Sequence, residues 1–121
     1  MLKKILLILS LVMLPACAGV FEDALQHNDK VLLYLYTPEC RYCKQSDPVF
    51  KKLSENYKNQ VKFIKVDANT EYGLILSMRN QATYVPYVVM VDSKAKEGHR
   101  LHPSCMINYA CANNALKDFV K

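Results

Sequence analysis

The stretch Val31–Cys43 reads VLLYLYTPECRYC and decides the fold class. Its first six residues are an unbroken apolar run, and the length and tyrosine content of that run predict a strand buried on both faces. Thr37 and Pro38 break the run. Apolar residues at helical spacing follow and predict a helix over 40–57, which Pro48 should kink. A buried strand that leads into an amphipathic helix is typical of an α/β protein.

Strands and helices continue to alternate on both sides of that stretch. The other predicted elements are helix 21–28, strand 61–66, helix 71–79, strand 84–91, strand 97–101 and helix 112–120. The strand–helix–strand order of the first half predicts a parallel pair with a right-handed crossover, whereas the last two strands predict a hairpin. We therefore expect one α/β domain over 19–121, with a central mixed β-sheet of about four strands flanked by helices.

Residues 1–18 read MLKKILLILSLVMLPACA and are interpreted as a signal peptide. They combine a charged start, an apolar run of about 10 residues and small residues at the end, and the run is too short for a bilayer span of ~20 residues. Cleavage after Ala18 would start the mature chain at Gly19. A lipid on Cys17 is one alternative, because Leu14–Cys17 resembles a bacterial lipobox, and a buried N-terminal helix is another. We expect a protein of the periplasm or cell envelope, attached to a membrane only if Cys17 is lipidated.

Composition restricts the classes of function. The chain has 121 residues, of which 51% are hydrophobic and 22% charged, as in one globular domain. The net charge is +5, but no basic run exceeds two residues. This pattern argues against a nucleic-acid partner.

Four cysteines remain outside the predicted leader, and an even number in an exported protein favours disulfides. Their spacing favours the pairs Cys40–Cys43 and Cys105–Cys111. The second pair is either a structural disulfide in a long loop or a second redox pair that exchanges with the first. A zinc site built from all four is a further alternative, but C-x5-C is a poor zinc half-site, so no metal is expected.

The first of these pairs has the spacing of a redox-active disulfide at the start of a helix. Free N–H groups and the helix dipole at that position stabilise a thiolate, so Cys40 is predicted to be the exposed catalytic nucleophile. Cys43, one turn further on, is predicted to be buried and to resolve the mixed disulfide. Arg41 adds a positive charge that favours the thiolate, and Glu39 opposes it.

Over residues 20–121 the chain resembles the thioredoxin superfamily. Pro48 lies five residues after the second cysteine of the motif, where thioredoxins carry the proline of the active-site helix. Lys65 lies at the position of the buried thioredoxin lysine, and the resemblance implies a role in tuning the pKa of the cysteine pair. Val85–Pro86 resembles the cis-proline dipeptide that faces the cysteines and binds extended substrate, and Tyr42 is expected beside the same groove.

The resemblance implies a thioredoxin-like fold and the activity of a thiol–disulfide oxidoreductase. Its substrates would be protein thiols and disulfides, its redox partner another protein of the envelope, and its only cofactor its own disulfide. Relatives that dimerise do so through an additional N-terminal domain, for which this chain has no room, so we expect a monomer. A redox-inactive domain that only binds partners is the alternative, against which the intact C-x-x-C motif argues.

The chain departs from the thioredoxin pattern at several positions. Tyr34 occupies the place of a buried aspartate that helps to move the proton of the resolving thiol. Glu39 replaces a tryptophan, and Arg41–Tyr42 replaces Gly-Pro. Residues 102–111, HPSCMINYAC, replace a short loop that borders the substrate groove. These departures predict a thioredoxin-like protein that is not one of the housekeeping members of the superfamily.

Overall fold

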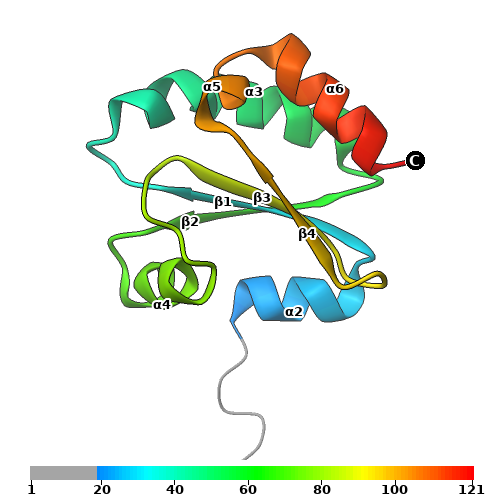
Figure 1. The fold of residues 1–121 in the computed structure, drawn as a ribbon, viewed down its shortest axis with the longest axis horizontal. Coiled ribbons are helices and arrows are strands. Elements are labelled where there is room, and N and C mark those ends of the chain that lie inside the picture. Colours follow the sequence, from blue (N-terminus) through cyan, green and yellow to red (C-terminus); the bar gives the residue numbers. More distant parts are fainter. Residues whose placement is uncertain (1–18) are drawn as a thin grey trace, which may run out of the picture.

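The protein is a four-stranded sheet with helices on both faces (Figure 1), seen in a computed structural model that describes residues 19–121. The signal peptide predicted for 1–18 and the alternatives for Cys17 lie outside the described residues. The strands are β1 (Lys30–Tyr36), β2 (Lys62–Asp67), β3 (Tyr87–Asp92) and β4 (Glu97–Leu101). The helices are α2 (Val20–His27), α3 (Arg41–Tyr57), α4 (Glu71–Arg79), α5 (Pro103–Met106) and α6 (Tyr109–Phe119). No helix in this described part of the chain is long and apolar enough to cross a membrane.

The sheet is mixed, with the strand order β2-β1-β3-β4. β1 runs parallel to β2 and antiparallel to β3, and β3 pairs with β4 in antiparallel orientation. The parallel pair is joined through α3, and the last two strands form the predicted hairpin. The predicted α/β class and its mixed sheet are therefore confirmed.

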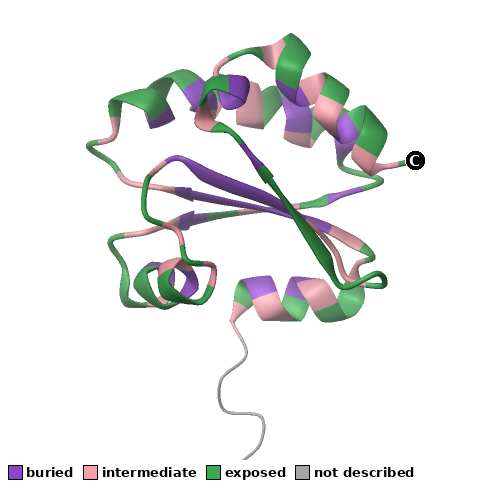
Figure 2. Ribbon diagram, viewed as in Figure 1, coloured by how far each residue is buried: buried purple, intermediate pink, exposed green. Residues whose placement is uncertain are grey.

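β1 lies in the middle of the sheet, and its residues 31–35 are buried. Helices α3, α5 and α6 cover one face of the sheet, and α2 and α4 cover the other (Figure 1, Figure 2). Because successive side chains of a strand point to opposite faces, Leu32 and Tyr34 join the core beneath α3 and α6, whereas Leu33 and Leu35 join the core with α2 and α4. Burial on both faces explains the unbroken apolar run.

Side-chain caps mark where α3 and α4 begin. Cys40 is the N-cap of α3, and its sulfur accepts a hydrogen bond from the backbone N–H of Cys43. Thr70 caps α4 in the same way, by accepting a 3.0 Å hydrogen bond from the N–H of Gly73. α3 continues past Pro48 without interruption.

Two predicted boundaries are wrong by about three residues. β3 begins at Tyr87 and not at residue 84, because Pro86 has no N–H to donate to the ladder and precedes the strand. The last helix begins at Tyr109 and not at residue 112, because the side chain of Asn108 caps it by accepting from a backbone N–H at 3.1 Å. In both cases the residue that directly precedes the element decides the boundary.

The short helix α5 is an element that the sequence analysis does not predict. Its first residue is Pro103, which suits the start of a helix because no N–H is needed there. His102 is the N-cap and accepts a 3.1 Å hydrogen bond from the N–H of Ser104. Four residues are too few to show a helical period of apolar side chains.

Candidate redox site

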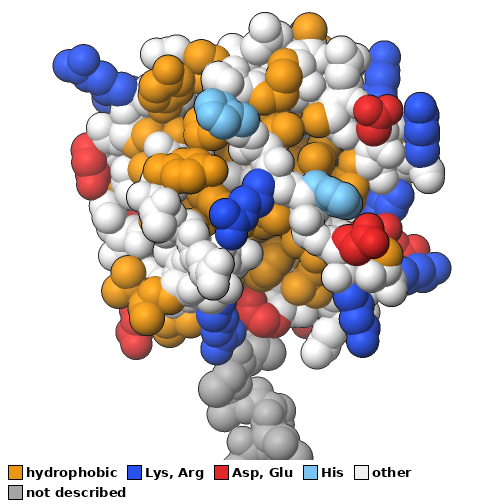
Figure 3. All heavy atoms as spheres, viewed as in Figure 1, with side chains coloured by type: hydrophobic (Ala, Val, Ile, Leu, Met, Phe, Trp, Pro, Cys, Tyr) orange, Lys and Arg blue, Asp and Glu red, His pale blue; other side chains and the backbone are white. Residues whose placement is uncertain are grey.

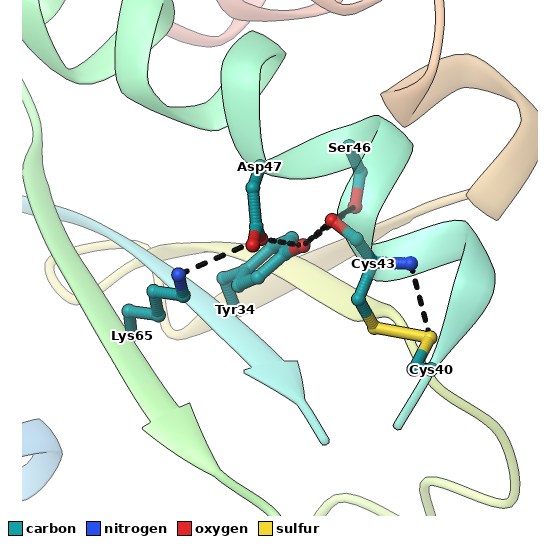
Figure 4. A network of polar contacts seen from close by, with 6 residues as sticks. All are labelled: Tyr34, Cys40, Cys43, Ser46, Asp47 and Lys65. Carbon is teal, nitrogen blue, oxygen red and sulfur yellow. Dashed lines mark hydrogen bonds and ion pairs between the residues drawn. A yellow bond between two sulfur atoms is a disulfide. The ribbon is translucent and has the colours of Figure 1, made fainter. Parts of the chain in front are cut away.

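Cys40 and Cys43 form a disulfide where β1 leads into α3 (Figure 4), as the sequence predicts. Their Cα atoms lie 5.2 Å apart, and the Cys40 sulfur accepts a 3.0 Å hydrogen bond from the N–H of Cys43. Cys40 is partly exposed, whereas Cys43 is 2% exposed. The two residues therefore differ in access, as an outer nucleophile and an inner resolving cysteine require.

The first turn of α3 supplies groups that favour a thiolate at Cys40. A backbone N–H already points at its sulfur, and the first turn of the helix contains no acidic residue. Such groups lower the pKa of a cysteine thiol. The two flanking charges act from exposed residues, where water screens them: Arg41 is exposed, and Glu39 accepts a 2.8 Å hydrogen bond from the Asn69 amide.

A buried hydrogen-bond network lies behind Cys43 (Figure 4). Tyr34 is 0% exposed and donates a 2.7 Å hydrogen bond to Asp47 Oδ1. Its hydroxyl also contacts Ser46 Oγ and lies 3.4 Å from the carbonyl oxygen of Cys43, to which Ser46 donates at 3.2 Å. Burial raises the pKa of the Tyr34 phenol, and the hydrogen bond and charge of Asp47 raise it further. The phenol is therefore a neutral donor.

Lys65 reaches this network from β2. It pairs with Tyr34 across the two parallel strands, and its Nζ lies 3.5 Å from Asp47 Oδ1. The side chain is 36% exposed and lies over the ring of Tyr36. Lys65 is thus not buried like the lysine that thioredoxins carry at this position, because β2 is an edge strand of the described sheet and leaves the ammonium group in contact with solvent. Its effect on the pKa of the cysteines stays a prediction.

Val85 and Pro86, two of the predicted substrate-binding residues, lie at the same end of the sheet as the disulfide. The Val85–Pro86 bond is cis, and the pairing of Leu35 with Tyr87 puts this bond beside the end of β1. Tyr42 and Tyr84 are 50% and 44% exposed, whereas the ring of Tyr87 is buried. Substrate binding by Val85, Pro86 and Tyr42 stays a prediction.

Cys105 and Cys111 form the second predicted disulfide, which joins α5 to α6. Their Cα atoms lie 5.3 Å apart, with Cys105 buried and Cys111 exposed. Met106 is fully buried in the core beneath α3, so the disulfide holds α5 where this side chain packs. Within residues 19–121, no group of three or more His, Cys, Asp or Glu side chains is placed to hold a metal ion.

Ser46 and Asp47 belong to the site but were not predicted from the sequence. They follow Cys43 by three and four positions, and this spacing on a helix brings side chains to one face. Two polar residues on the helix face turned toward the sheet were the available signal. Their partner, Tyr34, was identified only as a departure from the thioredoxin pattern.

The sequence of the chain is similar to those of known thioredoxins and of a probable protein disulfide-isomerase. A family model described as thioredoxin matches residues 13–101, which is more than half of the chain, and the match ends before Cys105. A thioredoxin from Borreliella burgdorferi is 32% identical over 75 residues, which cover 62% of this chain and 64% of that protein. A probable protein disulfide-isomerase A4 from Caenorhabditis elegans is 39% identical over 57 residues, which cover 45% of this chain and 9% of that protein. The chain spans less than two thirds of the length of both curated relatives.

Solved structures share the fold. The oxidised thioredoxin from Plasmodium falciparum gives a TM-score of 0.69 at 17% identity, and the match covers 87% of this chain and 94% of that chain. The reduced thioredoxin pre-protein from Schistosoma mansoni gives a TM-score of 0.69 at 23% identity, with coverages of 84% and 91%. At these identities the likeness establishes the fold alone.

Proposed function

The chain belongs to the thioredoxin family, and on that basis we propose that it is a thiol–disulfide oxidoreductase that acts on protein substrates through Cys40 and Cys43. The observation that carries this proposal is the disulfide at the start of α3, with a partly exposed outer cysteine and a buried inner one. A zinc site or a redox-inactive binding module would not need this difference in access.

Thiol–disulfide exchange between the protein and its substrate proceeds in two steps, which together transfer two electrons. In the reduced protein, the Cys40 thiolate attacks a substrate disulfide, forms a mixed disulfide and releases one substrate thiolate. The Cys43 thiol then loses its proton to solvent and attacks the Cys40 sulfur, which releases the second substrate thiolate and closes the Cys40–Cys43 bond. Two electrons pass from the protein to the substrate, and the same steps in reverse oxidise a substrate dithiol. The potential of the partner decides the direction.

Substrate recognition is assigned to the surface around the disulfide. Tyr42 and Tyr84 are exposed, and they directly precede Cys43 and Val85 in the chain. Val85 and Pro86 lie at the same end of the sheet as the disulfide. An extended segment of a substrate protein would place its sulfur beside Cys40 while its backbone contacts this end of the sheet. Exposed tyrosine is a side chain that protein interfaces favour.

We further propose that the protein works outside the cytoplasm. The order of charge, apolar run and small residues in 1–18 supports export, and two disulfides suit an oxidising compartment. The mature chain would begin at Gly19, or at a lipidated Cys17 attached to a membrane, and a second envelope protein would restore its redox state. A mass spectrum of the protein recovered from the cell envelope distinguishes these two starting residues.

Trapping of the mixed disulfide tests the activity. We expect Cys43→Ser protein to accumulate a covalent complex with a disulfide-bonded substrate protein, which appears on a non-reducing gel and disappears on reduction. Cys40→Ser protein should form no complex. The Cys105→Ala/Cys111→Ala variant is the matched control, because it removes two cysteines away from the site and should turn over normally. A complex that forms equally well without Cys40 would contradict the proposal.

A further inference from the structure

A carboxylate lies one helical turn after Cys43, next to the network behind the disulfide. Asp47 accepts the hydrogen bond of Tyr34 at 2.7 Å, and Tyr34 lies 3.4 Å from the carbonyl oxygen of Cys43. Figure 4 shows Lys65, Asp47 and Tyr34 following one another toward the cysteine pair. The carboxylate is therefore held in one place relative to the disulfide by groups from two strands.

The side chains between the Asp47 carboxylate and the cysteine pair are buried, and they screen charge poorly. Tyr34 and Ser46 are 0% exposed, and Cys43 is 2% exposed. Charges that interact across such buried groups are felt more strongly than charges that interact through water. The side chain of Asp47 is itself 39% exposed, so solvent and Lys65 reduce its field without cancelling it.

The phenol orients the carboxylate but does not carry protons to it. Tyr34 has one proton, and the short bond to Asp47 uses it. Ser46 also has one hydroxyl proton, and it donates this proton either to the carbonyl oxygen of Cys43 or to the hydroxyl oxygen of Tyr34. Because burial raises the pKa of the Tyr34 phenol, the donation from Tyr34 to Asp47 persists across the neutral range.

We propose that Asp47, held by Tyr34, is a positioning residue that sets the redox potential of the Cys40–Cys43 pair. The position at which thioredoxins carry a buried aspartate is Tyr34 in this chain, and α3 supplies a carboxylate from a different place. The inference deepens the proposed function, on which it rests.

The sign of the effect follows from charge. Reduction adds two electrons to the disulfide and leaves a thiolate at Cys40 and a thiol at Cys43, with one proton taken from solvent. The negative charge of Asp47 disfavours that thiolate, and the positive charge of Lys65 favours it. Asp47 and Lys65 line a surface cleft, and the other charged groups that line it are Lys44 and Lys51 on α3. Removal of the carboxylate charge should therefore stabilise the reduced, thiolate form.

Titration in glutathione buffers measures this effect. We expect Asp47→Asn to shift the equilibrium constant three- to tenfold toward the reduced protein at pH 8, where tenfold corresponds to about 30 mV for two electrons. The pH at which iodoacetamide begins to react rapidly with Cys40 should fall. Lys65→Gln should shift the equilibrium in the opposite direction.

Two further variants separate the proposed role from simple support of the fold. Glu55→Gln makes the same change of charge at an exposed residue further along α3, and should change the equilibrium constant less than twofold. In a Tyr34→Phe background, Asp47→Asn should have a smaller effect, because the carboxylate is no longer held. An Asp47→Asn protein that loses stability while its glutathione equilibrium and its pH profile stay unchanged would overturn the inference.

These outcomes are independent of the test of the proposed function. Glutathione reports on the Cys40–Cys43 pair without any protein substrate. A normal wild-type step with no shift in Asp47→Asn would overturn this inference alone. If the wild-type protein shows no reversible step that involves two thiols, both the proposed function and this inference are wrong.

Discussion

The hydroxyl of Tyr34 donates a 2.7 Å hydrogen bond to the carboxylate of Asp47, and this bond joins the central strand β1 to helix α3 immediately behind the disulfide. It crosses the interface at which the cysteine-bearing helix packs on the sheet. Because Tyr34 is fully buried, loss of its hydroxyl group leaves other polar groups without their partner. The bond therefore has consequences for stability as well as for redox chemistry.

Tyr34→Phe should lower the free energy of unfolding of the oxidised protein by about 1–3 kcal/mol, because Ser46 loses a buried partner. Urea unfolding followed by circular dichroism measures the change. Tyr84→Phe is the matched control, since Tyr84 is 44% exposed, and it should change stability by less than ~0.5 kcal/mol. Equal losses in the two variants would show that the buried network contributes nothing.

The stability contributed by the Tyr34 hydroxyl should disappear in alkaline solution. Burial raises the pKa of this phenol above its ordinary value of 10.0, so the group ionises first in the unfolded chain. Its stabilisation is fully present below pH 10 and is lost as the pH rises above that value. Unfolding measured between pH 8 and pH 11 should therefore show the difference between wild type and Tyr34→Phe becoming smaller. A difference that stays constant with pH would contradict this assignment.

Gly73→Ala should destabilise the protein by about 1–3 kcal/mol, because an added methyl group would overlap the backbone carbonyl oxygen of Asp67. Backbone atoms at this position, where β2 leads into α4, cannot move aside as a flexible side chain can. Gly98→Ala in β4 is the control, since its methyl group would lie 3.5 Å from Val89, an ordinary contact. Thermal unfolding of the two variants should separate them, and similar melting temperatures would contradict the close approach.

The central strand and the disulfide pairs were predictable because each depends on local sequence. The run from Val31 to Tyr36 is apolar at every position, which requires burial on two faces, and the spacing of Cys40 and Cys43 fits one helical turn. Helix α5 escaped prediction because a single turn begun by Pro103 has no periodicity to detect.

The environment of Lys65 and the role of Asp47 depend on how distant elements pack. Lys65 is partly exposed because β2 is an edge strand, and the order of strands in a sheet is not visible in the sequence of one strand. Asp47 meets Tyr34 because even-numbered residues of β1 face α3, which is known only once the helix has been placed on that face. The packing of distant elements, and not local propensity, therefore decides the exposure of Lys65 and the contact of Asp47 with Tyr34.

The Cys105→Ala/Cys111→Ala variant should lose about 2–3 kcal/mol of unfolding free energy, because the disulfide restricts the unfolded chain. Its Cys40–Cys43 pair should keep the wild-type equilibrium with glutathione if the second disulfide is structural. Urea unfolding and thiol titration together measure the two effects. An altered equilibrium at Cys40–Cys43 with little loss of stability would instead assign the second pair to the redox exchange.

A count of alkylated thiols by mass spectrometry, in wild-type protein equilibrated across glutathione buffers, tests the proposed redox activity of Cys40 and Cys43. We expect one reversible step in which two thiols appear together, assigned by peptide mapping to Cys40 and Cys43, while Cys105 and Cys111 stay oxidised throughout. A midpoint near −270 mV would fit a thioredoxin-like reductant, and a midpoint near −120 mV would fit an oxidant. The absence of any reversible two-thiol step at Cys40 and Cys43 would contradict the proposed thiol–disulfide oxidoreductase activity.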